Sequence, residues 1–126
     1  MPALEPVEGL RVVANAAALD AARWSGDDVD VVRIAPDEAF AIGATSVEVD
    51  DPDAIVESEA GFAVAFLDDE GQRALAAHTD WPISEAPGSL AQGKIAGVPA
   101  KLLVGDPSLL VTQVAYAEEL RSRLRW

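Results

Sequence analysis

The stretch that decides the fold is FAVAFLDDEGQRALAAH, from Phe62 to His78. Its opening run, Phe62 to Leu67, carries no charge and includes two aromatic side chains, which is typical of a strand in the middle of a sheet. Asp68 and Asp69 end this strand. Asp69 can accept an unpaired backbone N–H, and Gln72 follows at capping-box spacing, so a helix is predicted from Asp69 to His78. The other strands are expected to pair beside this one.

Length and charge limit what the chain can be. Its 126 residues predict a single domain, residues 1–126, in which residues 1–9 form a loosely held lead-in. The 22 acidic residues outnumber the nine basic ones and give a net charge of −13, which argues against nucleic acid or an anionic membrane as a partner. An acidic surface also serves solubility, and a chain whose lysines are only Lys94 and Lys101 also fits a salt-loving host.

The absence of cysteine excludes disulfides, thiolate nucleophiles and cysteine-ligated metal sites. The start of the chain, Met1 to Val13, lacks the basic and apolar regions of a secretory signal. No stretch approaches the roughly 20 apolar residues of a membrane-spanning helix. The expected location is the cytoplasm.

The first half of the chain is predicted to alternate strands with short helices. One helix is expected over Ala16–Trp24, and another from Pro52 to about Ser58, because Asp51 before Pro52 is a favourable helix start. Strands are expected at Leu10–Val13, Val29–Ile34, Ala39–Ile42 and Thr45–Val49, with turns at Ser25–Asp28 and Ala35–Glu38.

The second half is predicted to contain a surface connection, a hairpin and a closing helix. Thr79–Ser89 is the connection, with Trp81 and Ile83 packed against the core. Leu90–Val104 is interpreted as one strand, or two pieces of one, with a bend near Pro99. A turn, a partner strand and a helix follow at Gly105–Ser108, Leu109–Val114 and Ala115–Leu124. Together these elements predict an α+β fold, an antiparallel or mixed sheet with short helices packed on one face.

No set of residues in the sequence predicts a catalytic site. His78 is the sole histidine, and neither Ser84 nor Ser89 lies in the glycine pattern of a nucleophile elbow. Asp68 and Glu70 could form an acid–base pair, but acidic residues at a helix start are stabilised there without any catalytic role.

No metal, nucleotide or cofactor site is predicted either. Carboxylates gather at Asp50, Asp51, Asp53, Glu57 and Glu59, but their spacing lacks the glycine and the final glutamate of a calcium loop. No phosphate-binding or zinc-protease motif occurs. The chain itself is therefore expected to hold no catalytic, cofactor-binding or metal-binding residue.

One run of sequence resembles a known family. Val32-Arg-Ile-Ala-Pro-Asp-Glu-Ala-Phe-Ala-Ile-Gly43 is similar to the R-L-x-P-D-E-W-L segment of the gamma subunit of heterotetrameric sarcosine oxidase. The order of elements that follows, up to Leu124, is similar too. In that family the aromatic residue directly follows the Pro-Asp-Glu turn, whereas here Ala39 precedes Phe40.

This resemblance implies both a fold and a function. The fold would resemble a folate-binding aminomethyltransferase-type domain. The chain would be a non-catalytic, gamma-like subunit of a flavin-dependent N-methyl-amine oxidoreductase, a heterotetramer in which larger subunits hold FAD, FMN, NAD and tetrahydrofolate. For such a subunit, Trp81, Pro82, Ile83 and Trp126 are predicted to form the partner interface, because exposed aromatic and apolar groups anchor interfaces.

Two other functions remain open at this stage. The first is a free-standing acidic accessory domain that binds a small, folate-type molecule in an apolar slot, with Asp80 and Lys94 as polar contacts. The second is an acid–base enzyme that uses Asp68 and Glu70.

Overall fold

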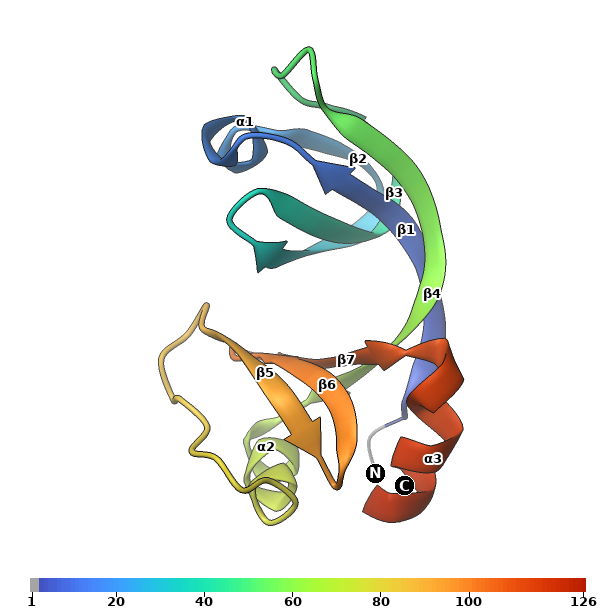
Figure 1. Ribbon diagram of the computed structural model, residues 1–126, viewed down its shortest axis with the longest axis vertical. Coiled ribbons are helices and arrows are strands. Elements are labelled where there is room, and N and C mark those ends of the chain that lie inside the picture. Colours follow the sequence, from blue (N-terminus) through green and yellow to red (C-terminus); the bar gives the residue numbers. More distant parts are fainter. Residues whose placement is uncertain (1–2) are drawn as a thin grey trace. The chain divides into compact units, whose positions relative to one another are not determined.

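The computed structural model describes residues 3–126, and its chain divides into two compact units. Unit 1 comprises Gly61–Trp126 together with the described part of Met1–Pro6, and unit 2 comprises Val7–Ala60 (Figure 1). Each unit has its own hydrophobic core. The expectation that residues 1–126 fold as one domain stays a prediction, and Met1 and Pro2 lie outside the described residues.

The described part of the chain contains seven strands and three helices. The strands follow the order β2-β3-β1-β4 in unit 2 and β4-β7-β6-β5 in unit 1. In chain order the elements are β1 (Glu5–Val13), α1 (Ala16–Asp20), β2 (Arg23–Ala35), β3 (Glu38–Glu48), β4 (Ile55–Leu67), α2 (Asp69–Ala76), β5 (Leu90–Ile95), β6 (Val98–Leu103), β7 (Ser108–Gln113) and α3 (Val114–Leu124).

The predicted fold class, α+β with short helices packed on one face of the sheet, is wrong, because the described chain is mainly antiparallel strand. The helix expected from Pro52 to Ser58 does not form, and Ile55 instead begins the long strand β4. The helix expected from Ala16 ends at Asp20, and Arg23 already belongs to β2. In both segments the hydrogen bonds and packing of the sheet stabilise a strand more than the local helix propensity stabilises a helix.

Unit 2 is built on a hairpin of β2 and β3. Ala35 pairs with Glu38 at its turn, which confirms the turn predicted around Pro36. In β3 the residues from Ala39 to Ile42 are all buried, whereas in β1 buried Leu10 and Val12 alternate with exposed Arg11. The unit 2 core is completed by small side chains of α1, of β3 and of the residue that follows β1: Ala18, Ala39, Ala41, Ala44 and Ala14.

Two glycines bend this hairpin. Gly26 has φ 152° and Gly43 has φ 81°, and the register of β2 and β3 shifts on both sides of Gly26. A Cβ atom on Gly26 would lie 2.2 Å from the Gly43 carbonyl oxygen. The two backbones can therefore approach this closely only because neither residue has a side chain.

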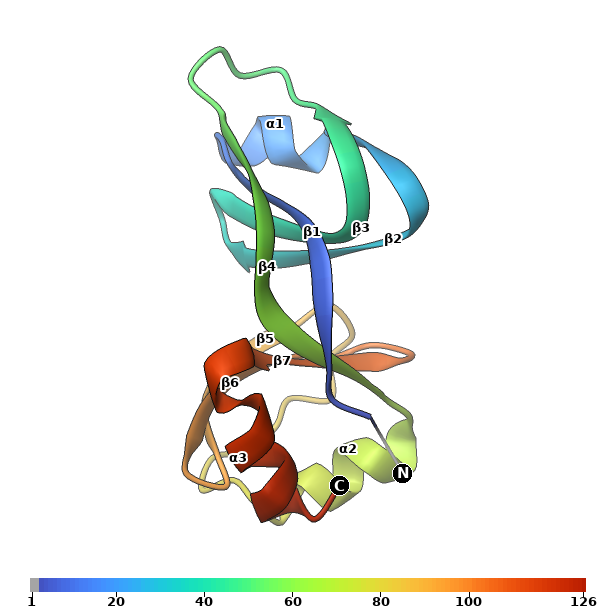
Figure 2. The same cartoon turned by 90° about the vertical axis from the view of Figure 1, so that its right-hand side faces the viewer.

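Unit 1 packs two helices against its sheet. Ala63, Ala65 and Leu67 of β4 point into a core that also contains Leu75 of α2 and Leu120 of α3, so both helices cover the same face (Figure 2). β4 and β7 pair from Phe62–Gln113 to Leu67–Ser108, which confirms the predicted strand at Phe62–Leu67.

The ends of the unit 1 chain are joined by a side chain of α3. Arg121 donates from Nη1 to the carbonyl oxygen of Leu4 at 2.7 Å, and Leu4 itself is buried in the unit 1 core. The start of the chain is therefore tied down earlier than the predicted lead-in of residues 1–9 suggests, because β1 already begins at Glu5. Among residues 3–126, no helix is both long and apolar enough to cross a bilayer.

Candidate functional site

Trp81 of the predicted interface is held against the unit 1 core. Its indole Nε1–H donates to the carbonyl oxygen of Lys94 at 3.2 Å, and the Thr79 hydroxyl donates to the carbonyl oxygen of Trp81 at 3.1 Å. The ring lies over Gly93, where a Cβ atom would be 2.7 Å from Nε1. Trp81 is thus positioned by β5 and is only partly exposed.

The other predicted interface residues differ in exposure. Ile83 and Trp126 are partly buried and pack on the same core as Trp81, whereas Pro82 is exposed. Trp126 follows α3, and its backbone N–H bonds to the carbonyl oxygen of Arg121 at 3.0 Å. The four residues therefore all lie on unit 1, and their role as an interface stays a prediction.

The carboxylates near α2 have structural roles. Asp68 is the N-cap of the helix, since its Oδ1 accepts from the Gly71 N–H at 2.7 Å. The prediction that Asp69 caps this helix is wrong, because Asp69 lies in the first turn together with Glu70. His78 follows the helix and is exposed.

The Asp51 carboxylate organises the loop before β4. It accepts from the backbone N–H of Asn15 at 2.8 Å and from that of Asp53 at 2.9 Å. These hydrogen bonds, chiefly the one from Asn15, hold the pKa of Asp51 below its usual value. Within residues 3–126, no group of histidine, cysteine or carboxylate side chains is arranged to hold a metal ion.

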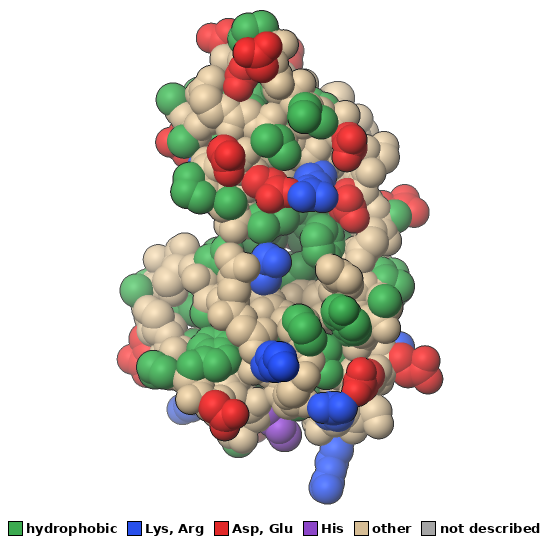
Figure 3. All heavy atoms as spheres, viewed as in Figure 1, with side chains coloured by type: hydrophobic (Ala, Val, Ile, Leu, Met, Phe, Trp, Pro, Cys, Tyr) green, Lys and Arg blue, Asp and Glu red, His purple; other side chains and the backbone are tan. Residues whose placement is uncertain are grey.

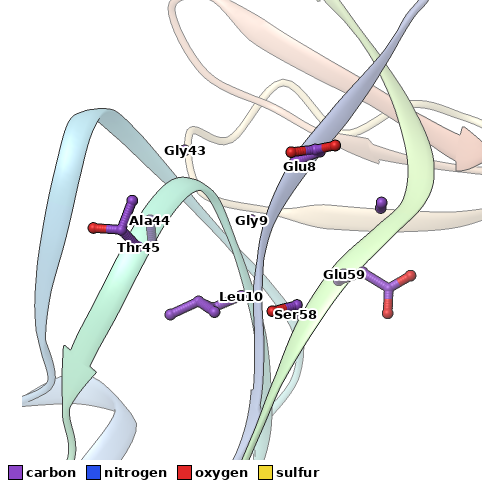
Figure 4. Close-up of a pocket in the computed structure, with 9 residues that line it drawn as sticks. Glu8, Gly9, Leu10, Gly43, Ala44, Thr45, Ser58 and Glu59 are labelled. Atoms are coloured by element: carbon purple, nitrogen blue, oxygen red, sulfur yellow. The ribbon is translucent and has the colours of Figure 1, made fainter.

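Unit 2 has a surface hollow of about 530 Å³ between β1, β3 and β4. Leu10 and Ser58 point toward the β3 strand at Ala44 and Thr45, while Glu59 points to the other side (Figure 4). The Thr45 hydroxyl donates to the Ser25 carbonyl oxygen at 3.2 Å. The lining is completed by residues with short side chains or none, and by one further acid: Gly9, Gly43, Ala60 and Glu8.

The groups that line this hollow are not arranged for acid–base chemistry. Its walls are mostly backbone and small side chains, and its carboxylates do not converge, because Glu59 faces away from Leu10 and Ser58 (Figure 4). Acid–base work requires groups within hydrogen-bond reach of one reacting atom. The geometry of this hollow therefore does not assemble a reaction centre.

Unit 1 has a second hollow, of about 570 Å³, beside α2. Asp69 and Arg73 of α2, Glu85 of the following connection and Asp106 of the β6–β7 turn line it. Behind it the buried Ser108 hydroxyl donates to Gln72 Oε1 at 2.5 Å, linking the helix to the turn. Asp80 and Lys94, the contacts expected for a folate-type ligand, line neither of these two hollows.

The surface is acidic, and only some of its basic side chains form ion pairs. Acidic side chains are spread over the face in Figure 3 rather than gathered in one place. Among the arginines, Arg11 pairs with Glu38, Arg33 with Asp20, and Arg123 with Glu119. Within the described part of the chain, Lys94 and Lys101 form no ion pair of this kind.

The two hollows were missed by the sequence reasoning. The available signal for the first is Gly9, directly before the predicted strand Leu10–Val13, and Gly43, between two predicted strands, since glycine beside or within a strand often marks a close backbone approach. The second is assembled by the connection after α2 and the β6–β7 turn, whose relative placement no local pattern encodes.

Comparison with known proteins defines the fold. No protein-family model matches the chain, and neither does any curated protein sequence. Among solved structures, a chain of the heterotetrameric sarcosine oxidase from Corynebacterium sp. U-96, determined in complex with pyrrole 2-carboxylate, is similar with a TM-score of 0.66 and 14% identity. The match covers 98% of this chain and 79% of that chain. The chain therefore has a fold related to that of a sarcosine oxidase subunit.

Proposed function

We propose that the chain is a non-catalytic small subunit of a heteromeric, sarcosine-oxidase-like complex that oxidises an N-methyl amine. It docks on larger subunits, which bind the flavins and the folate. FAD, FMN, NAD and tetrahydrofolate belong to those partners in this proposal. The observation that carries it is the fold likeness to a chain of heterotetrameric sarcosine oxidase.

The extent of that likeness supports a small subunit. The alignment takes up 98% of this chain and 79% of the matched chain, so the matched chain cannot be many times longer than this one. A likeness to one domain of a large catalytic subunit would cover a much smaller share of that subunit. The likeness therefore extends over most of the matched chain.

The candidate reactive groups also support a structural subunit. Asp68 caps α2, and Asp51 binds the backbone of Asn15 and Asp53. Each carboxylate is thus used to hold the fold in place. What the chain offers a partner is surface, including the predicted interface on unit 1 around Trp81.

The test is co-expression of the tagged chain with the proteins encoded by its neighbouring genes. The proposal predicts that a flavin-containing amine oxidase co-purifies with the chain and oxidises N-methyl amino acids. A chain that elutes alone, with every neighbouring flavoprotein active and fully assembled without it, contradicts the proposal.

A second measurement separates the proposal from a free-standing folate-binding domain. Calorimetric titration of a reduced folate into the isolated chain is expected to give no binding heat, and the purified complex is expected to bind the folate. Saturable binding to the isolated chain, with defined stoichiometry, would favour the free-standing domain instead.

A further inference from the structure

The β5–β6 hairpin has one face packed inside unit 1 and a second face whose residues are exposed or partly exposed. Ile95, Val98, Ala100 and Leu102 are buried in the unit 1 core. The alternating residues point the other way, because successive side chains of a strand lie on opposite faces. This outer face consists of three opposed pairs, Leu90–Leu103, Gln92–Lys101 and Lys94–Pro99.

The outer face carries both lysines of the chain. Lys94 is exposed and Lys101 is partly exposed, and within the described residues neither takes part in an ion pair. Neither β5 nor β6 contains an acidic residue, although the chain has 22. This face is thus positively charged, through Lys94 and Lys101, on a protein that is acidic as a whole.

Apolar side chains accompany this charge. Leu90 and Leu103 oppose each other on the face and are partly exposed, and Pro99 is exposed. Apolar groups beside unpaired charges are what a specific protein interface requires, since the apolar groups contribute burial and the charges contribute orientation. A free lysine on the edge strand β5 also discourages pairing of another strand along that edge. A partner would therefore meet the face of the hairpin.

We propose that the outer face of the β5–β6 hairpin is the docking surface for an acidic protein surface of a partner subunit. The proposal rests on the proposed function, since it names where the small subunit meets its partner. Charge complementarity selects the occupant. Lys94 and Lys101 attract carboxylates, whereas the other surfaces of this chain, whose net charge as a whole is −13, repel an acidic partner.

Zero-length carbodiimide cross-linking of the co-purified complex tests this contact directly. The reagent joins a lysine amine to a carboxylate only when the two groups touch, and the chain offers just Lys94 and Lys101 besides its N-terminal amine. The expected result is a set of peptides in which these lysines are linked to Asp or Glu of the partner. Cross-links that involve only the N-terminus, or lysine links only within the chain, overturn the proposal.

Charge-reversed variants give a quantitative test. The double variant Lys94→Glu with Lys101→Glu is expected to raise the Kd of the complex by about tenfold or more and to flatten its dependence on salt. The control is Arg23→Glu with Arg125→Glu, which changes the net charge equally at two exposed arginines that belong to neither β5 nor β6. This control is expected to stay within about threefold of the wild-type Kd.

The outcomes separate the two proposals. If the wild-type chain binds no neighbouring flavoprotein, the proposed function fails and the docking surface fails with it. If the wild-type chain binds, and the lysine and arginine variants weaken binding equally, only the docking surface fails. Circular dichroism and thermal unfolding of each variant confirm that the fold is retained.

Discussion

At the scale of single residues, Asp51 makes the stability of the fold depend on pH. Its carboxylate accepts two backbone N–H groups, and its pKa is lowered as a result. A carboxyl whose pKa is lower in the folded chain than in the unfolded one stabilises the fold above its unfolded-state pKa. That stabilisation is lost as the pH falls through the folded-state value.

We expect Asp51→Asn to lower the Tm at neutral pH, and the difference from wild type to shrink as the pH falls below the ordinary aspartate pKa of about 3.9. Thermal unfolding followed by circular dichroism across this range measures the effect. Asp53→Asn is the control, because the Asp53 side chain forms no hydrogen bond within the described chain. A difference between Asp51→Asn and wild type that is independent of pH would contradict the assignment.

Gly93 is a second residue at which the packing leaves no room for a side chain. A Cβ atom there would lie 2.7 Å from Nε1 of Trp81. We expect Gly93→Ala to displace the indole, break its hydrogen bond to Lys94 and cost about 1–3 kcal/mol in the free energy of unfolding. The displaced ring should also shift the tryptophan emission to longer wavelength.

Gly88→Ala is the comparison for this substitution. Gly88 also lies in unit 1, at φ 84°, but a Cβ atom there meets nothing within 4 Å. Strain in the backbone will lower the stability of Gly88→Ala without moving Trp81. Equal emission spectra for the two variants would show that Trp81 does not pack over Gly93.

At the scale of elements, α2 depends on its cap. Asp68 accepts from the Gly71 N–H at 2.7 Å, so Asp68→Ala is expected to cost about 1 kcal/mol in urea-induced unfolding. Glu70→Ala lies in the same first turn and removes only a favourable interaction with the helix dipole, a few tenths of a kcal/mol. Equal losses in the free energy of unfolding for the two variants would contradict the assignment of Asp68 as the helix cap.

The stretch from Phe62 to His78 was predictable because its signals agree. An uncharged run, an acidic stop and a capping pattern all indicate strand followed by helix, and the structure has β4 followed by α2. The segment after Asp51 carried a misleading signal. Its carboxylate bonds to the N–H of Asp53, two residues on, which forms a turn with the same composition as a helix start. Sheet pairing beyond the reach of local sequence then drew Ile55 into β4.

The docking face could not be derived from sequence for a similar reason. Ala96 and Gly97 both have positive φ, 51° and 81°, and together they turn β5 into β6. Two-residue hairpin turns of this kind are usually predicted from Asn-Gly or Asp-Gly, and Ala-Gly is a weak predictor of them. Without the turn the register is unknown, and the register is what places Lys94 and Lys101 on one face.

At the scale of the whole molecule, similarity of fold is detectable where similarity of sequence is low. The chain shares 14% identity with a sarcosine oxidase chain, while its fold aligns with a TM-score of 0.66. A fold of this kind needs apolar residues at alternating strand positions and glycines at close approaches, and many sequences meet these demands. The resemblance carried by Val32–Gly43 and by the order of the elements after it indicated a related fold, and the structure forms that run as the hairpin of β2 and β3.

The central claim is that this chain acts as a subunit, and native mass spectrometry of the co-expressed proteins tests it most directly. The account predicts an assembly in which this chain is present at a fixed, whole-number ratio to a flavin-containing partner. It also predicts that the assembly dissociates as the salt concentration rises. A 13.2 kDa chain that remains free at every protein concentration, beside a partner that is complete and active without it, would contradict the account.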